Sequence, residues 1–226
     1  MSISVVIADD QELVRTGFRM ILDNSPGIEV LADVADGHEA LAAVRELRPN
    51  VLLADIQMPG LDGLEVTRLL RQDGASGAED GRRPQVVIIT TFDDDAYVRT
   101  ALRYGASGFL LKDASPALLV EAVRAAAAGD SLISPAVTVR LLADMAAGRS
   151  PVSGGRPPRE ELTEREKEVV VLTAQGRTNA EIADELHLSV SSIKAHLARV
   201  QAKLDARNRV EVALWAWESG LSQGRS

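Results

Sequence analysis

The chain has 226 residues, 46% of them hydrophobic, which suits two small domains with packed cores. It contains no cysteine, which excludes disulfides and thiolate metal sites and favours a reducing compartment such as the cytoplasm. The formal net charge of −8 argues against a nucleic-acid partner for the chain as a whole.

The N-terminus and the apolar runs predict a protein without a membrane partner. Met1 leads directly into a short strand-like run rather than into a signal peptide. No apolar run reaches the roughly 20 residues that a membrane span needs. We therefore expect a soluble, cytoplasmic protein.

Short apolar runs alternate with stretches of helical periodicity from Ser2 to about Gly129. The runs are continuously apolar, which predicts strands buried on both faces. They are Ile3 to Ala8, Glu29 to Ala35, Val51 to Asp55, Val86 to Thr90 and Gly108 to Lys112. Helical spacing begins near Gln11, Gly37, Gly63, Asp94 and Ser115. Five such βα units predict a parallel sheet covered by helices on both faces.

Two polar stretches interrupt this pattern. Gln72 to Pro84 is rich in glycine and longer than a usual connection, which predicts a surface insertion. Gly148 to Pro158 concentrates Gly, Pro and Ser as flexible linkers do. We predict a domain over residues 1–130, a linker over 131–158 and a second domain over 159–226.

Polar side chains follow four of the predicted strands at their carboxyl ends. These positions meet in one crevice of a parallel sheet even when they are distant in sequence. The residues are Asp9 and Asp10, Asp55, Thr90 and Lys112. Each alone is most often turn chemistry or a solvated charge, but the combination would rarely arise by chance.

Carboxylates gathered in one crevice repel each other, and either raised pKa values or a bound cation relieves this repulsion. Mg²⁺ fits best because it prefers hard oxygen ligands and retains waters that a phosphate can replace. Asp55 is then the predicted nucleophile towards a phosphoryl donor, with Lys112 neutralising charge on the transferring oxygens. Asp9 and Asp10 would hold the metal with the backbone carbonyl of Gln57, and Thr90 would donate its hydroxyl to the phosphoryl group.

Four segments of this part resemble the receiver domains of bacterial two-component response regulators. They are IADD at Ile7 to Asp10, LLADIQMPGLDG at Leu52 to Gly63, IITTF at Ile88 to Phe92 and GASGFLLKDAS at Gly105 to Ser115. The resemblance implies a flavodoxin-like α/β fold with a five-stranded parallel sheet in the order 2-1-3-4-5. It also implies phosphotransfer from a histidine kinase to Asp55, with Thr90 and Phe109 coupling phosphorylation to a surface change.

The last seventy or so residues predict four helices. Thr163 with Glu166, Thr178 with Glu181, and Asn208 with Glu211 each place a capping oxygen three residues before an acid, and Ser189 can cap the third helix. Gly176 to Leu204 contains a short helix, a turn at His187 to Ser189 and a longer helix. Val190 to Arg209 carries the positive charge that the global average conceals, at Lys194, Arg199, Lys203, Arg207 and Arg209.

The long helix predicts a core face and a nucleic-acid face. Ile193, Leu197, Val200 and Leu204 recur at helical spacing and must face the core, with His196 at its edge. The opposite face carries small side chains, Ser191, Ala195, Ala198 and Ala202, flanked by Lys194 and Arg199, which suits a major groove. Lys203, Arg207 and Arg209 are predicted phosphate contacts.

The sequence from Leu162 to Leu204 resembles the LuxR-type helix-turn-helix, which makes the chain similar to NarL/FixJ-type response regulators from end to end. In that family the residues at Lys194 and Ala195 face bases. With the resemblance, the predicted DNA-contacting residues are Thr178, Ser191, Ser192, Lys194, Ala195, Ala198, Arg199 and Lys203. The predicted partner is a double-stranded DNA operator.

The last helix has two apolar sides, and a small bundle buries only one. Val210, Ala213, Leu214 and Trp217 lie on one side, and Val212, Trp215 and Ala216 on the other. The second side suggests dimerisation on phosphorylation or DNA binding, although both tryptophans packing within the domain is nearly as good an interpretation.

These features predict a phosphorylation-dependent transcriptional regulator rather than an enzyme. One alternative is a haloacid-dehalogenase-like phosphatase, but it would need an acid at Gln57, two residues after the nucleophile. The other is a DNA-binding regulator whose receiver only binds a ligand or a partner protein, against which the intact acidic set argues.

Overall fold

The computed structural model describes residues 2–73, 83–91, 95–130, 132–133 and 158–221. The chain divides into two compact units, Met1–Arg140 and Leu141–Ser226. Most of the predicted linker, 131–158, and most of the predicted insertion, 72–84, lie outside the described residues. Within the described residues, no helix combines the length and apolarity that crossing a bilayer requires.

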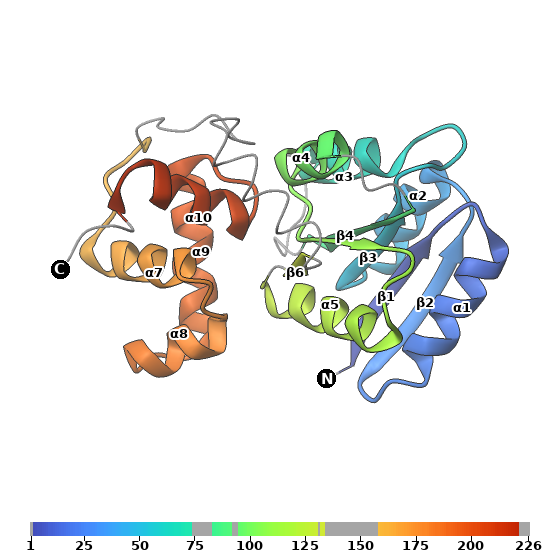
Figure 1. Ribbon diagram of the computed structural model, residues 1–226, viewed down its shortest axis with the longest axis horizontal. Helices are drawn as coiled ribbons and strands as arrows, with labels where there is room; N and C mark the ends of the chain where they lie inside the picture. The colour runs from blue at the N-terminus through green and yellow to red at the C-terminus, as the bar shows by residue number, and fades with distance from the viewer. Residues whose placement is uncertain (1, 74–82, 92–94, 131, 134–157, 222–226) are drawn as a thin grey trace. The chain divides into compact units, whose positions relative to one another are not determined.

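The first unit is a parallel α/β sheet (Figure 1). Its strands are β1 (Ile3–Ala8), β2 (Ile28–Val34), β3 (Val51–Asp55), β4 (Gln85–Thr90), β5 (Gly108–Leu111) and β6 (Leu132–Ile133). They lie in the order β2-β1-β3-β4-β5-β6, so the predicted 2-1-3-4-5 order is confirmed, and β6 adds a two-residue edge strand that sequence reasoning missed.

Helices cover both faces of this sheet. They are α1 (Glu12–Asp23), α2 (Gly37–Leu47), α3 (Gly63–Asp73), α4 (Asp95–Tyr104) and α5 (Pro116–Ala128). Leu22 of α1 and Leu119 of α5 share a core with Val5, Val51 and Val87 of the sheet. Figure 1 shows α2, α3 and α4 on the opposite face.

The predicted burial of every strand on both faces is wrong for β2. Its residues alternate between buried and exposed, with Ile28 and Val30 buried but Glu29 and Leu31 exposed. The reason is its place at the edge of the sheet, where β1 is its pairing partner. In contrast, every residue of the central strand β3 is buried.

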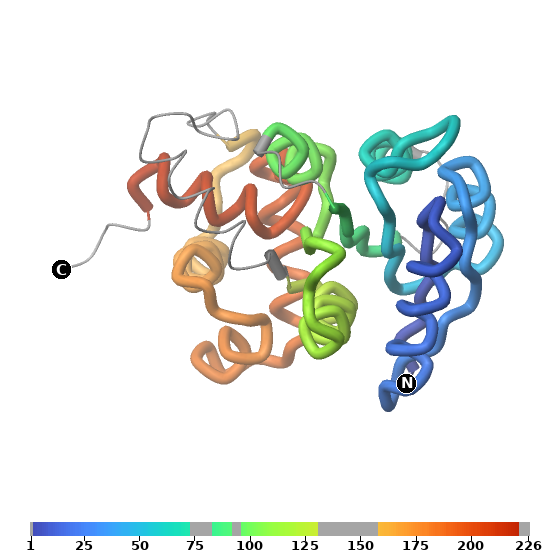
Figure 2. Tube along the Cα trace, turned by 45° about the vertical axis from the view of Figure 1, so that its right-hand side comes forward, coloured from blue at the N-terminus to red at the C-terminus, as the bar shows by residue number. Residues whose placement is uncertain are grey.

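The described part of the second unit, residues 158–221, contains four helices. They are drawn from orange to red in Figure 2. They are α7 (Glu164–Ala174), α8 (Asn179–Leu186), α9 (Val190–Leu204) and α10 (Arg209–Glu218). The predicted capping oxygens are confirmed: the side chains of Thr163, Thr178, Ser189 and Asn208 each accept a hydrogen bond from the backbone N–H three residues later. Two apolar clusters of its own, around Ile182 and Ile193 and around Val170 and Val212, hold this unit together.

Candidate functional site

Three charged side chains meet at the carboxyl ends of β1, β3 and β5. The Nζ atom of Lys112 lies 2.7 Å from Oδ2 of Asp9 and 2.9 Å from Oδ2 of Asp55. The side chains of Lys112, Asp9 and Asp55 are only 8%, 3% and 5% exposed. The sequence reasoning that these strand ends converge is therefore correct, and Lys112 bridges the two acids.

Asp10 adds a third carboxylate on the solvent side of this group. It is exposed, whereas Asp9 and Asp55 are buried. Carboxylate oxygens of the three residues all lie within 4.8 Å of one another. Three hard oxygen donors at this spacing, with one of them open to water, fit a divalent cation such as Mg²⁺.

The buried charges change the pKa of both central groups. Burial raises the pKa of Asp55, and the hydrogen bond and positive charge of Lys112 oppose this shift, while the negative charge of Asp9 adds to it. For Lys112, burial works to lower the pKa, but hydrogen bonds to Asp9 and Asp55 outweigh it and the pKa is raised. The lysine therefore stays protonated, and the site favours an additional positive charge near Asp55.

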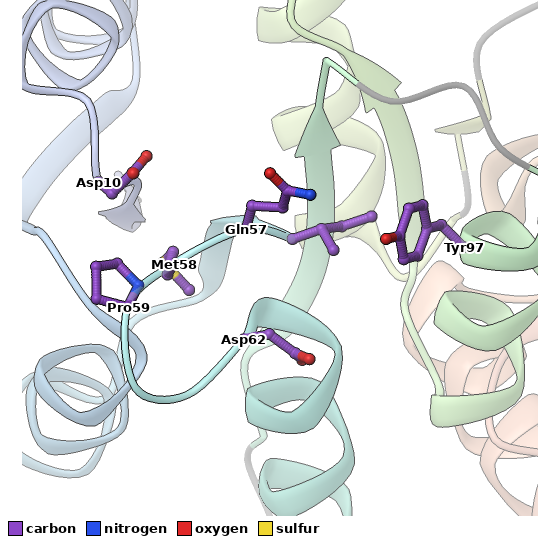
Figure 3. Close-up of a pocket in the computed structure, with 7 residues that line it drawn as sticks. Asp10, Gln57, Met58, Pro59, Asp62 and Tyr97 are labelled. Carbon is purple, nitrogen blue, oxygen red and sulfur yellow. The ribbon is translucent and has the colours of Figure 1, made fainter.

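An open pocket of about 400 Å³ lies beside this group (Figure 3). It is lined by Asp10, Ile56, Gln57, Met58, Pro59, Asp62 and Tyr97. Gln57 belongs to the loop that leaves β3, so its main chain is next to the acidic group. Tyr97, on α4, was not predicted, because nothing in its local sequence distinguishes it from other tyrosines on helix surfaces.

Thr90 and Phe109 are both fully buried, with exposed fractions of 0%. Thr90 ends β4, and Asp55 pairs with the preceding residue, Ile89, in the sheet register. Phe109 lies within β5, in register with Ile88. The structure thus places Thr90 at the same end of the sheet as Asp55, while the switch roles of Thr90 and Phe109 stay predictions.

Gly63 is the first residue of α3 and packs against the backbone at the end of β3. Its backbone N–H donates to the carbonyl of Ile56 at 3.0 Å. A Cβ atom at this position would lie 2.0 Å from the carbonyl oxygen of Asp55. The absence of a side chain therefore allows α3 to begin directly against the strand end that carries Asp55.

Replacing Gly63 with alanine is expected to destabilise the first unit by roughly 1–3 kcal/mol, because the backbone has to move away from Asp55. Chemical unfolding with circular dichroism measures this. Gly17→Ala is the matched control, since Gly17 lies within α1 with no atom within 4 Å of a new Cβ. It is expected to gain up to about 1 kcal/mol from helix propensity, and an equal loss in both variants would contradict the proposed clash.

The burial pattern of α9 agrees with the predicted core face and exposed face. Ile193, Leu197 and Val200 are buried in the two cores of the second unit. Exposed on the opposite side are Ser191, Lys194, Ala195, Ala198, Arg199 and Ala202. Thr178 is exposed at the start of α8, and Ser192 is half-buried. His196 is half-buried and its Nδ1 lies 3.1 Å from Nη2 of Arg199, in keeping with a position at the core edge.

The three cations predicted to contact phosphates have partners within the chain. Lys203 lies 2.9 Å from Oε2 of Glu166, and Arg207 lies 3.7 Å from Oε1 of Glu211. Arg209 donates to Oδ1 of Asn179 at 2.9 Å. Sequence reasoning missed these partners because each pairing depends on how the helices pack or cap.

The predicted dimer face of α10 is wrong. Val212 and Ala216 have exposed fractions of 0% and pack into the core around Val170, with Trp215 against them. The exposed aromatic residue is Trp217, at 50%, on the other side of the helix. Both sides are apolar in sequence, so periodicity alone could not decide which side α7 covers.

Comparison with known proteins assigns both units. Residues 5–124 match the family "Response regulator receiver domain", and residues 160–216 match "Bacterial regulatory proteins, luxR family". The chain belongs to the LuxR-type response regulators. This family consists of DNA-binding regulators rather than classical enzymes.

Relatives of this response regulator match it over nearly its whole length. It is 33% identical to the transcriptional regulatory protein LiaR of Bacillus subtilis, covering 97% of this chain and 99% of that protein. It is also 33% identical to the nitrate/nitrite response regulator NarL of Escherichia coli, covering 96% of each. The crystal structure of the response regulator ChrA from a heme-sensing two-component system matches with a TM-score of 0.52, at 34% identity over 97% of this chain and 98% of that one.

Proposed function

We propose that this response regulator is the cytoplasmic output component of a two-component system and accepts a phosphoryl group on Asp55 from a histidine kinase. The observation that carries this proposal is the buried Asp55 carboxylate, 2.9 Å from Lys112 and within 4.8 Å of two further acids. A structural role for the cluster would not call for the exposed Asp10, whereas a site that takes up a cation and a phosphoryl group needs such an opening.

In the reaction, a carboxylate oxygen of Asp55 attacks the phosphorus atom of the phosphohistidine. The new P–O bond forms as the P–N bond breaks, and the leaving imidazole keeps the bonding electron pair. Lys112 neutralises charge on the transferring oxygens, and Thr90 donates its hydroxyl to the bound phosphoryl group. Mg²⁺, held by Asp9, Asp10, Asp55 and the carbonyl of Gln57, would supply further charge neutralisation when bound.

Phosphorylation then shifts a conformational equilibrium of the receiver, with Thr90 and Phe109 linking the site to the surface. The shifted form favours homodimers in which two helix-turn-helix domains read two half-sites of an operator. The proposed DNA-contacting residues are Thr178, Ser191, Ser192, Lys194, Ala195, Ala198 and Arg199.

Incubation with acetyl phosphate and Mg²⁺, followed by intact mass spectrometry, tests the proposal. The expected result is stable addition of one phosphoryl group, mapped to Asp55. Turnover of the phosphorylated form into free phosphate many times per chain would instead support a phosphatase. No addition at all, together with unchanged DNA affinity in beryllofluoride, would reject phosphorylation control and favour a receiver that responds to a ligand.

Magnesium is expected to stabilise the first unit, because it binds the folded acidic group and relieves repulsion between its carboxylates. At a concentration about 100 times its Kd, the gain in unfolding free energy is about 2.7 kcal/mol. Thermal unfolding with and without MgCl₂ measures it. Asp10→Asn should lose most of the gain, while Asp113→Asn, which alters an acid outside the cluster, should keep it; equal gains in both variants would contradict the assigned ligands.

A further inference from the structure

Glu166 is a buried carboxylate that joins α7, the first described helix of the second unit, to the recognition helix α9. It occupies the third position of α7, where its Oε2 atom accepts from the backbone N–H of Thr163 at 2.8 Å. The same oxygen accepts from Nζ of Lys203 at 2.9 Å, and Oε1 lies 4.0 Å from Nε of Arg199. Its side chain is only 4% exposed.

Lys203 is held on more than one side. Besides Glu166, its ammonium donates to the backbone carbonyl of Glu161 at 3.1 Å. Its own backbone carbonyl accepts from the N–H of Arg159 at 2.7 Å. The side chain is 18% exposed, compared with 59% for Arg199. Lys203 therefore links the segment before α7, at Arg159 and Glu161, to the end of α9.

Moving Lys203 to a DNA phosphate would leave the Glu166 carboxylate buried without its main partner. Leaving a buried charge without a partner is strongly destabilising, whereas an ion pair with a solvent-exposed phosphate contributes little stabilisation. Burial works to raise the pKa of Glu166, but hydrogen bonds from Lys203 and Thr163 outweigh it and lower the pKa, so the carboxylate stays ionised at neutral pH. The ion pair is therefore expected to persist on DNA.

Arg199 is placed differently. Its guanidinium lies between His196 and Glu166 at the edge of the core, yet more than half of the side chain faces solvent. A guanidinium has five N–H donors in a planar fork, so some remain for DNA while the others orient the group.

We propose that Glu166 is a positioning residue for DNA binding, which withdraws Lys203 from the phosphate backbone and orients Arg199 on the exposed face of α9. This inference rests on the proposed DNA-binding function. On this proposal Lys203 holds the domain together instead of contacting DNA. Glu166, which belongs to α7 but contacts α9, then sets the number of charges that α9 presents to DNA.

The salt dependence of DNA binding tests the inference. The logarithm of the binding constant falls with the logarithm of the salt concentration by about 0.9 for each phosphate that a cation neutralises. The experiment measures this slope by fluorescence anisotropy, with the full chain and a labelled duplex of mixed sequence. Lys203→Gln is expected to keep the wild-type slope. Lys194→Gln is the matched control: on a duplex of mixed sequence this exposed lysine contacts phosphate rather than a specific base, so its loss is expected to make the slope shallower by about 0.9.

Glu166→Gln is expected to change the slope of the salt dependence in the opposite direction. It releases Lys203, so the slope is expected to become steeper by about 0.9, and Glu166→Gln/Lys203→Gln is expected to return it to the wild-type value. Simple loss of structure would weaken binding without steepening the slope. Circular dichroism shows whether the Glu166 variants fold; if they do not, Lys203→Gln alone decides.

A shallower slope for Lys203→Gln, comparable to that of Lys194→Gln, would overturn the inference. An unchanged slope for a folded Glu166→Gln variant would also overturn it. Failure of the proposed function has a different signature, because the wild-type chain would then show no salt-dependent binding to the duplex.

Discussion

Asp55→Asn is expected to abolish phosphoryl addition from acetyl phosphate completely. The amide lacks the nucleophilic oxygen that the carboxylate provides, and Asp9, the other buried acid beside Lys112, is assigned to hold the metal. Intact mass spectrometry after incubation with the donor and Mg²⁺ measures the outcome. Asp62→Asn, an acid of the adjacent pocket, is the matched control and should be phosphorylated normally.

The same substitution is expected to stabilise the metal-free chain at neutral pH. The folded-state pKa of Asp55 is raised above its ordinary value of 3.8, mainly by burial. Its favourable contribution is therefore fully present below pH 3.8 and is lost as the pH rises through the folded-state pKa. The stability difference between the variant and wild type should accordingly shrink as the pH falls towards 4. A variant less stable than wild type at pH 7 without metal would contradict this account of the electrostatics.

Lys112→Met is expected to cost the metal-free first unit roughly 3–5 kcal/mol, because it leaves Asp9 and Asp55 buried without their shared cation. Mg²⁺ should restore part of the loss, since it neutralises the same carboxylates. Phosphorylation should slow by roughly 100- to 1000-fold, the usual effect of removing one charge-stabilising group from a reaction site. Chemical unfolding and timed mass spectrometry measure the two effects.

Arg68→Met is the matched control for Lys112→Met. Arg68 also pairs with an acid, Glu65, but on the surface of α3, where solvent screens the pair. Little change in stability or phosphorylation is expected. If both variants lost the same stability, burial would not be what makes Lys112 important.

The acidic group was predictable because its geometry follows from topology. Asp9, Asp55 and Lys112 each end a strand, and the ends of parallel strands share one edge of the sheet whatever the intervening sequence is. The burial of β2 was not predictable from its composition, because it depends on which strand lies at the edge. The crossover connections, and not the strands themselves, determine which strand lies at the edge of the sheet.

Two features of the second unit depend on packing that local sequence does not encode. Val212 and Trp217 lie on opposite apolar sides of α10, and only the position of α7 decides which side is buried. Lys203 has the exposed, basic neighbours of a DNA-contacting residue, but its carboxylate partner is 37 residues earlier in the chain. Patterns of period 3.6 detect a helix face and say nothing about a pair formed between two helices.

The separate apolar clusters of the two units have a thermodynamic consequence for this response regulator. Within the part of the chain that the structure describes, the core around Val5 and Val51 shares no residue with those around Ile182 and Val212. Each unit can thus melt in its own transition, so a single midpoint for the chain would average two events. In calorimetry, Lys112 and Asp55 variants would shift the midpoint of one heat-absorption peak, and Glu166 variants would shift the midpoint of the other. A metal titration would shift only the first.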